Sequence, residues 1–275
     1  MPAYYLHDLS PFIFEFPGGW GLRWYGLAYV LSFVLGGWLY KWLARRGYTD
    51  LPEAQVGDFI TWCAVFGVML GGRLGWALFY GWREVIEHPL SLLRVWEGGM
   101  ASHGGILGLV LFTFYWSRRK KLSWTSIGDS LVVVAPIGLF IVRLANFING
   151  ELYGKPTDVP WAVIFPASGD GLPRHPSQLY EALLEGVVLF LALWLLRTRC
   201  RVSRGVLTGA FFILYAVLRI AGEFFREPDP AWAVGWISAG QFLSIFMVFI
   251  GAAFLVWGWR KQEYERVFLD AGQSR

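Results

Sequence analysis

Charged residues are scarce in this sequence, and their scarcity argues against a water-facing surface. Asp, Glu, Lys and Arg make up 16% of the 275 residues, whereas a soluble domain usually carries about 25%. Hydrophobic residues reach 56%, and the mean hydropathy is +0.46. The 16 tryptophans fit the aromatic belts that form where a membrane meets water. We therefore predict an all-α polytopic membrane protein that forms one domain over residues 1–275.

Cysteines and metal-binding motifs are also scarce. The two cysteines, Cys63 and Cys200, lack C-x-x-C spacing, which argues against a disulfide framework and a thiolate metal site. Three of the histidines, His7, His88 and His175, are not spaced as a set of zinc ligands. The sequence contains no G-x-S-x-G, H-E-x-x-H, Walker or Asp-rich metal motif. Metal-dependent phosphoryl transfer is therefore disfavoured, and we predict no metal site.

Seven apolar segments have the length of about 17–25 residues that a helix needs to cross a membrane. Their approximate limits are 20–40, 57–80, 99–117, 126–148, 178–196, 206–226 and 236–258. The first 19 residues lack the basic start of a signal peptide and are predicted to form an amphipathic lead-in. Small residues recur every four positions at Gly67, Gly71 and Gly75 and at Gly104 and Gly108, which predicts close helix packing.

The basic residues predict the orientation of these spans. The connections between spans 1 and 2, 3 and 4, and 5 and 6, together with the C-terminal tail, carry 15 Lys and Arg residues, whereas the opposite side carries five. Basic residues favour the cytoplasmic side. We therefore expect the N-terminus outside the cytoplasm and the C-terminus in the cytoplasm, and an odd number of spans likewise requires the two ends to lie on opposite sides.

One stretch, V-R-L-A-N-F-I-N-G-E-L-Y-G over residues 142–154, places polar groups at membrane depth. It carries Arg143, Asn146, Asn149 and Glu151 within nine residues. An ionised Arg in a bilayer costs at least roughly 2.5–3.5 kcal/mol unless a partner or a polar cavity compensates it. Because the guanidinium fork matches phosphate oxygens, the stretch predicts a site that binds an anion.

Other polar residues are predicted to lie in the outer half of their spans, on the same side of the membrane. They are Arg23, Arg73, Arg219, Tyr25, His103, Glu181 and Glu223. Together with Arg143 and Glu151 they predict a polar, cationic cavity that opens toward the outer leaflet. Tyr215, Arg219, Glu223 and Arg226 share one helical face.

The roles of several of these residues stay open on sequence grounds. Glu223 could orient Arg219 toward an anionic ligand, or the two could form an ion pair that only locks helix packing. His103 lies between two glycine pairs, so it is either a structural residue or a proton acceptor close to a ligand. Arg73 lies among small residues, so it fits a helix-packing role as well as a ligand-binding role. Ser177 fits a helix N-cap, and its neighbours Gln178, Tyr180 and Glu181 are left open.

Several motifs in the same order resemble those of the bacterial prolipoprotein diacylglyceryl transferase family. They are the tyrosine-containing start of the first span, G-G-R-L-G, M-A-S-H-G-G, R-L-A-N-F-I-N-G-E-L-Y-G, R-H-P-S-Q-L-Y-E-A and the E-F-F-R-E-P-D that ends the sixth span. One departure is Val142, where the family signature commonly begins with Gly. The resemblance covers most of the chain.

The resemblance implies a cofactor-free enzyme of the bacterial inner membrane with seven spans. Such an enzyme moves the diacylglyceryl group of phosphatidylglycerol to the lipobox cysteine of a preprolipoprotein, forms a thioether and releases glycerol phosphate. By the same resemblance, Arg143 and Arg219 hold the phosphate, and His103 is the candidate base for the thiol. The substrate-binding residues it implies are Tyr25, Arg73, Asn146, Asn149, Glu151, Gly154, Tyr215, Glu223 and Arg226, with Glu151 and Glu223 fixing the arginines.

Two alternatives remain at this stage. The cationic field of the arginines could itself favour the thiolate, so that His103 would only position a substrate. A non-catalytic lipid-binding or transport protein could use the same cavity, although the internal repeats common in transporters are not evident.

Overall fold

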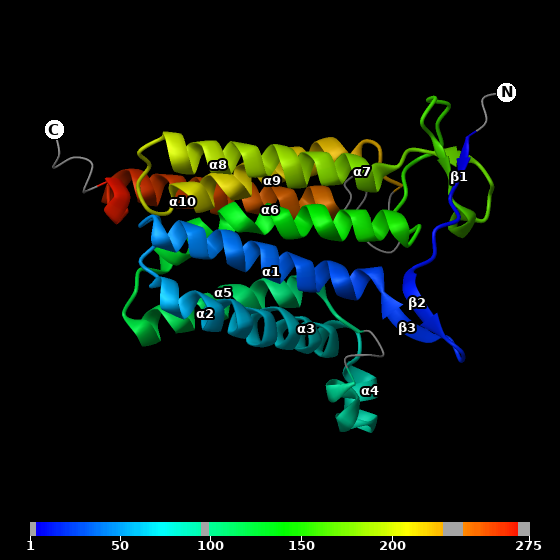
Figure 1. The fold of residues 1–275 in the computed structure, drawn as a ribbon, viewed down its shortest axis with the longest axis horizontal. Coiled ribbons are helices and arrows are strands. Elements are labelled where there is room, and N and C mark those ends of the chain that lie inside the picture. Colours follow the sequence, from blue (N-terminus) through cyan, green and yellow to red (C-terminus); the bar gives the residue numbers. More distant parts are fainter. Residues whose placement is uncertain (1–3, 95–98, 228–238, 269–275) are drawn as a thin grey trace. The chain divides into compact units, whose positions relative to one another are not determined.

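The computed structural model describes residues 4–94, 99–227 and 239–268, and it is mainly helical (Figure 1). The chain divides into two compact units. The first comprises residues 1–39 and 129–264, and the second comprises residues 40–128 and 265–275. Helices α1 (Trp24–Arg45) and α6 (Trp124–Ile148) each continue from one unit into the other.

The first unit contains most of the long helices. Besides α1 and α6 it holds α7 (Ser177–Glu181), the π-helix η6 (Ala182–Val188), α8 (Leu189–Arg199), α9 (Val206–Glu223) and α10 (Ala239–Lys261). Helix α9 packs along α10 and also contacts α8. A Cβ atom added to Gly209 would lie 2.8 Å from the Gly251 carbonyl oxygen, so only glycine allows this approach.

A buried carboxylate fixes the start of α9. Asp129 of α6 is fully buried, and it accepts hydrogen bonds from the backbone N–H groups of Gly205 (2.8 Å) and Thr208 (2.9 Å) and from the Thr208 hydroxyl (2.7 Å). These N–H groups have no partner within the helix, so the carboxylate satisfies them and complements the helix dipole. Arg197, also fully buried, interacts electrostatically with Asp129.

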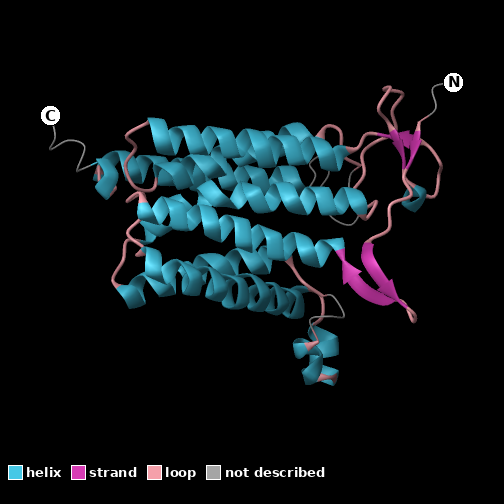
Figure 2. Cartoon of the chain, in the orientation of Figure 1, coloured by secondary structure: helices cyan, strands magenta, loops and turns pink. Residues whose placement is uncertain are grey.

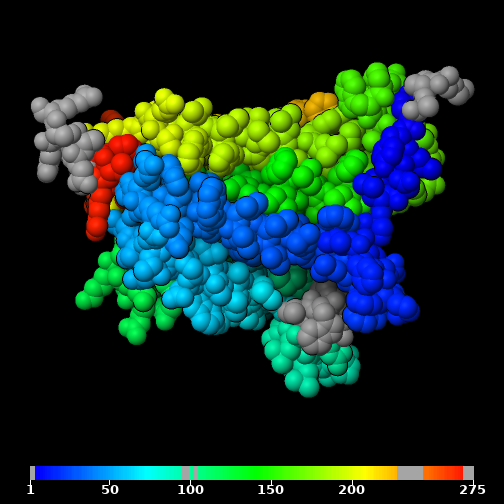
Figure 3. Space-filling view, viewed as in Figure 1, coloured from blue at the N-terminus to red at the C-terminus, as the bar shows by residue number. Residues whose placement is uncertain are grey.

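The strands that the structure describes all belong to the first unit and lie at one end of its helices (Figure 2). Strands β1 (Tyr5–Leu6), β4 (Val163–Ile164) and β5 (Pro173–Arg174) form a sheet in the order β1-β4-β5, in which β1 and β4 are parallel. In the space-filling view the N-terminal residues, in blue, lie against the green segment that carries β4 (Figure 3).

The N-terminal segment differs from the predicted amphipathic lead-in. Strands β2 (Phe12–Phe16) and β3 (Trp20–Arg23) pair as an antiparallel hairpin. Gly18 and Gly19 have φ of 106° and 79°, so they supply the positive φ angles of the turn. The first predicted span was therefore wrong over residues 20–23, which belong to β3, and the helix begins at Trp24.

In the second unit a nearly continuous helix packs against α5. It consists of the 3-10 helix η1 (Glu53–Gln55), α2 (Val56–Trp62), the π-helix η2 (Cys63–Leu70) and α3 (Gly71–Phe79). Helix α4 (Trp82–Glu87), the 3-10 helix η3 (Pro89–Leu93) and α5 (Ser102–Lys120) follow.

The glycines that were predicted to allow close helix packing do so. A Cβ atom on Gly71 would lie 2.6 Å from the Gly104 carbonyl oxygen and 2.9 Å from the Gly108 Cα atom. A Cβ atom on Gly75 would lie 2.6 Å from the Gly104 Cα atom. The backbones of α3 and α5 therefore meet along a glycine seam.

Six helical segments of the described residues are long and apolar enough to cross a membrane. They are Trp24–Arg45, Glu53–Phe79, Trp124–Ile148, Ser177–Arg199, Val206–Glu223 and Ser244–Lys261. The prediction of a multi-pass helical membrane protein is thus confirmed. Helix α5 occupies the third predicted span, but it is not one of the six, and its last turn carries Arg118, Arg119 and Lys120. Part of the last predicted span, residues 236–238, lies outside the described residues.

Candidate functional site

Three arginines and three glutamates gather in the first unit, where α6, α7, η6 and the end of α9 approach one another. Arg143 of α6 bridges Glu181 (3.0 Å) and Glu185 (3.1 Å) with its two terminal nitrogens. Arg219 of α9 binds Glu181 through Nη1, which also lies 3.5 Å from Glu185. Both glutamates are fully buried, and the two arginine side chains are only 14% and 12% exposed.

Two further ion pairs complete this arginine–glutamate cluster. Arg219 Nη2 lies 2.8 Å from Glu223, four residues later on α9. Arg226, just after α9, lies 3.4 Å from Glu181. Tyr215, one turn before Arg219, interacts electrostatically with Glu185 and Arg143. Tyr215, Arg219 and Glu223 share the predicted face of α9 and supply one wall of the cluster. Arg226 lies beyond the end of the helix, so the prediction that it shares this helical face was wrong.

The cluster differs from the predicted cationic cavity because its formal charges balance. Arg143, Arg219 and Arg226 carry three positive charges, and Glu181, Glu185 and Glu223 carry three negative ones. The carboxylates therefore hold the guanidinium groups in place in an environment where an unpaired charge would be costly. Each guanidinium has five N–H donors, so donors remain for an incoming anion.

Glu185 was missed in the sequence analysis, although a signal for it exists. It is the second of two carboxylates in an otherwise apolar span, and an ionisable residue inside a span is by default a functional candidate. It lies within π-helix η6, and single π-helical turns are frequent at functional sites. Glu181, which the sequence left open, is the most connected carboxylate of the cluster, with contacts to three arginines.

Glu151 does not contact the arginines as the resemblance implied. Its carboxylate Oε1 accepts hydrogen bonds from the side-chain amides of Asn146 (2.7 Å) and Asn149 (3.4 Å), and the described residues include no ion pair between Glu151 and an arginine. Gly150, with φ of 68°, turns the chain back after α6, so that Glu151 reaches the buried Asn146. Glu151 follows just after α6, so the side-chain amides of the last turn of that helix are closer to its carboxylate than the arginines are.

Two polar residues at the start of α7 hold the same turn. Gln178, fully buried, donates a hydrogen bond from Nε2 to the Glu151 carbonyl oxygen (2.6 Å), and Ser177 donates from its hydroxyl to the Leu152 carbonyl oxygen (3.0 Å). The Ser177 side chain thus bonds another segment rather than capping its own helix, so the N-cap prediction was wrong. Gln178 Oε1 and Asn149 Oδ1 are buried without a hydrogen-bond partner among the described residues.

Gly154 lies where three segments meet. A Cβ atom there would lie 2.5 Å from the Phe225 carbonyl oxygen and 2.6 Å from the His175 carbonyl oxygen. Gly154 also pairs with Arg226 in an isolated bridge, which fixes the backbone next to the Arg226 side chain. Glycine is therefore required at this position by backbone packing, and the packing holds Arg226 beside Glu181.

An ion-pair network outside the spans supports this junction. Arg174 donates hydrogen bonds to the Gly154 carbonyl oxygen (3.0 Å), to Glu227 (2.9 Å) and to Asp170 (2.5 Å). The hydrogen bond from Arg174 holds the pKa of Asp170 well below its usual range, and the same bond raises the pKa of Arg174. Partial burial lowers the pKa of the neighbouring His175.

Tyr25 lies at the start of α1, and its ring contacts that of Tyr29 at a centroid distance of 5.4 Å. Tyr29, which the sequence analysis did not single out, interacts electrostatically with both Tyr25 and Glu151. The Tyr29 side chain therefore links Tyr25 electrostatically to the turn that carries Glu151. Arg23 lies in β3 and stacks over Phe12 at 4.8 Å.

The remaining predicted residues belong to the second unit. Arg73 is 3% exposed, and it donates hydrogen bonds to the backbone carbonyl oxygens of Leu92 (3.0 Å), Gly99 (3.0 Å) and Arg94 (3.2 Å), and to that of Ser91. These bonds give it a structural role in the segment that precedes α5. His103 is the second residue of α5, and its side chain lies outside the described part of the structure.

The arrangement in the first unit suits the binding of a phosphate group. Donors from two separate helices converge, and buried carboxylates fix them before a ligand arrives. Such preorganised donors stabilise charge that develops on a leaving group, because they need not reorganise during the reaction. Over the described ranges, no group of His, Cys, Asp and Glu residues is arranged to hold a metal ion.

Comparisons with known proteins identify the family. The profile of the family described as prolipoprotein diacylglyceryl transferase matches residues 11–257. A phosphatidylglycerol–prolipoprotein diacylglyceryl transferase of Coxiella burnetii is 43% identical over 263 residues, which is 94% of this chain and 99% of the relative. Proteins with the same name from Rhodospirillum rubrum (46% identity, 90% of this chain and 92% of the relative) and Nitratidesulfovibrio vulgaris (46%, 83% and 86%) are also similar. The family expected from the motifs is thereby confirmed: the chain belongs to the prolipoprotein diacylglyceryl transferase family.

Proposed function

We propose that this protein transfers the diacylglyceryl group of phosphatidylglycerol to the lipobox cysteine of bacterial preprolipoproteins, the first step of lipoprotein maturation. The cysteine sulfur forms a C–S bond to the glycerol carbon of the lipid, and the C–O bond from that carbon to the phosphate breaks. The products are a thioether and glycerol phosphate. The thiol proton finally resides on the released phosphate or in solvent, so atoms and charge balance without a cofactor.

The observation that carries this proposal is the convergence of Arg143 and Arg219 on one buried pair of carboxylates. Arg143 and Arg219 bind the lipid phosphate with the donors that Glu181, Glu185 and Glu223 leave unused. Their attraction strengthens as negative charge accumulates on the leaving phosphate, which is the condition for lowering the barrier. Arg226 and Tyr215 complete the wall around that phosphate.

The turn after α6 binds the head group of the lipid. Tyr25, Asn146 and Asn149 supply polar groups there, and Glu151 orients the two amides. The free acceptors Asn149 Oδ1 and Gln178 Oε1 match the hydroxyl groups of the glycerol head group, which are hydrogen-bond donors. Gly154 keeps the turn in place, and Arg73 holds the segment before α5.

His103 is the proposed general base. With an unperturbed pKa of about 6.5, an imidazole accepts a proton from a thiol of pKa about 8.5 at neutral pH. The arginines provide an alternative, because nearby cations lower the pKa of a thiol.

The proposed topology has seven spans, with α5 as the third, a periplasmic N-terminus and a cytoplasmic C-terminus in the bacterial inner membrane. It follows the excess of Lys and Arg on one side of the predicted spans. The catalytic site then faces the periplasmic leaflet. A lipid-binding or transport protein without catalysis is the alternative, and the names of the similar proteins favour the enzyme.

Mass spectrometry of a synthetic lipobox peptide tests the reaction. The purified protein is incubated with the peptide and phosphatidylglycerol, and the expected result is a mass gain of one diacylglyceryl group on the cysteine. A peptide with serine in place of this cysteine is the control and should gain no mass. An unmodified cysteine peptide, with protein shown to be folded, would contradict the proposal and favour the lipid-binding alternative.

The same assay tests the role of His103. His103→Gln is expected to abolish turnover while lipid binding persists. Turnover at the wild-type rate would show that His103 is not the general base. It would favour the alternative in which the arginines lower the pKa of the thiol.

A further inference from the structure

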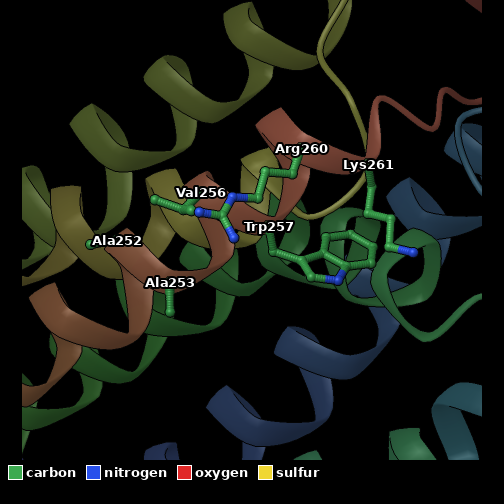
Figure 4. Close-up of a pocket in the computed structure, with 6 residues that line it drawn as sticks. All are labelled: Ala252, Ala253, Val256, Trp257, Arg260 and Lys261. Atoms are coloured by element: carbon green, nitrogen blue, oxygen red, sulfur yellow. The ribbon is translucent and has the colours of Figure 1, made fainter.

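A surface groove lies on α10, near its C-terminal end. It has a volume of about 620 Å³, and its lining consists of Ala252, Ala253, Val256, Trp257, Arg260 and Lys261 (Figure 4). Helix α10 ends at the side of the first unit opposite to the strands (Figures 1 and 2), and the arginine–glutamate cluster lies toward the strands.

The lining residues form two parallel rows on one helix. Ala252, Val256 and Arg260 follow one another at intervals of four, as do Ala253, Trp257 and Lys261. Residues four apart lie above one another on a helix surface. Each row therefore runs from a small residue through a larger apolar one to a basic residue, and Arg260 and Lys261 are consecutive at the same end of the helix. In Figure 4 their charged groups lie on either side of Trp257.

The dimensions match one leaflet of a bilayer. Ala252 and Lys261 are nine residues apart, which corresponds to about 13 Å along a helix. Half of a hydrocarbon core is about 15 Å thick. The head group of a lipid at this site would thus lie beside the cations. Its acyl chain would run over Val256 and the alanines and end near the membrane midplane.

The two cations are available to a ligand. Arg260 and Lys261 are both exposed, and no ion pair of either is found in the described part of the chain. A contrasting hollow of about 410 Å³ in the second unit is lined by Trp62, Phe66, Phe112, Tyr115 and Trp116 alone, so its lining carries no charge. Of these two hollows, the groove on α10 is the one that combines apolar side chains with a pair of basic residues.

We propose that this groove binds one anionic phospholipid, whose phosphate lies between Arg260 and Lys261 and whose acyl chain lies along Ala252, Ala253 and Val256. Basic groups next to apolar helix surfaces at the cytoplasmic side are suited to acidic lipid head groups. With the proposed topology the lipid belongs to the cytoplasmic leaflet. The site is separate from the transferase chemistry, so its test does not depend on the reaction.

Photo-crosslinking of the full-length protein in lipid nanodiscs tests the site. The probes are phosphatidylglycerol and phosphatidylcholine that carry the same photoreactive acyl chain, and cross-links are mapped by peptide mass spectrometry. We expect the phosphatidylglycerol probe to label residues 252–257 in preference to the phosphatidylcholine probe. Two cationic contacts of about 1 kcal/mol each correspond to a preference of roughly 30-fold.

Two variants sharpen the test. Arg260→Gln/Lys261→Gln should abolish the preference, whereas Arg119→Gln/Lys121→Gln, which removes two exposed charges from the end of α5, should keep it. The first variant should still modify the lipobox peptide. Equal labelling of residues 252–257 by the two probes in the wild-type protein, or an unchanged preference in Arg260→Gln/Lys261→Gln, would overturn the proposal.

Discussion

Replacing Glu181 with glutamine removes one negative charge from the arginine–glutamate cluster while nearly preserving side-chain shape. Glu181 is fully buried and contacts Arg143, Arg219 and Arg226. The substitution leaves three buried guanidinium groups with two carboxylates. Removing one partner of a buried ion pair costs about 3–5 kcal/mol, because the remaining charge is uncompensated. For a protein of this size the expected decrease in Tm is at least about 6 °C.

Thermal unfolding in detergent, followed by intrinsic fluorescence, measures this effect. Glu227→Gln is the matched control, because Glu227 makes one ion pair at 2.9 Å and its side chain is 44% exposed. An exposed pair is worth about 1 kcal/mol or less, so the control should unfold close to the wild-type temperature. Glu181→Gln/Arg226→Gln restores the charge balance and should regain part of the loss, with a coupling of about 1 kcal/mol.

The reasoning would be refuted if Glu181→Gln unfolded within about 2 °C of the wild-type protein, which is typical of a surface substitution. It would also be refuted if Glu227→Gln were equally damaging. Turnover provides a second readout, since arginines that are no longer held should bind the phosphate in less productive positions. We expect Glu181→Gln to lower kcat in the fraction that remains folded.

Three further predictions concern the surroundings of the cluster. Gln178→Leu removes a buried acceptor near the head group and should raise KM for phosphatidylglycerol roughly tenfold, as measured by peptide modification. Asp129→Ala leaves the start of α9 uncapped and should destabilise the protein by about 3 kcal/mol while turnover per folded molecule is retained, as measured by calorimetry and active-site titration. The Asp170–Arg174 bond contributes stability above the unfolded carboxyl pKa of about 3.9, and this contribution is lost as the pH falls through that value and the lower folded pKa. Hydrogen exchange in residues 149–176, corrected for intrinsic rates, should therefore increase at acidic pH, and Asp170→Asn should remove this dependence.

Features that depend on local spacing were predictable from the sequence. The glycine repeats predicted close helix packing, because a missing Cβ has the same steric effect in any bundle, and the structure shows that the partners are α3 and α5. The i, i+4 spacing of Arg219 and Glu223 predicted their ion pair. Arg143 was singled out because a buried cation needs a partner or a function.

Features that depend on tertiary contacts were not predictable from the sequence. The partners of Arg143 are Glu181 and Glu185, about 40 residues away along the chain, and no periodicity within one helix connects them. Glu151 was expected beside an arginine, but the turn at Gly150 brings it to Asn146. The β2–β3 hairpin was missed because its apolar strands were treated as a lead-in and as the start of a span, although the two glycines between them are a turn signal.

The most direct test of the central claim, that Arg143 and Arg219 together bind the lipid phosphate during the reaction, is the rate of diacylglyceryl transfer to the lipobox peptide in single variants. Arg143→Ala and Arg219→Ala should each abolish the mass gain of the peptide, whereas Arg83→Ala, which removes an exposed arginine of α4, should retain it. Each variant is compared at equal amounts of folded protein. Peptide modification at the wild-type rate in Arg143→Ala or in Arg219→Ala would contradict the account.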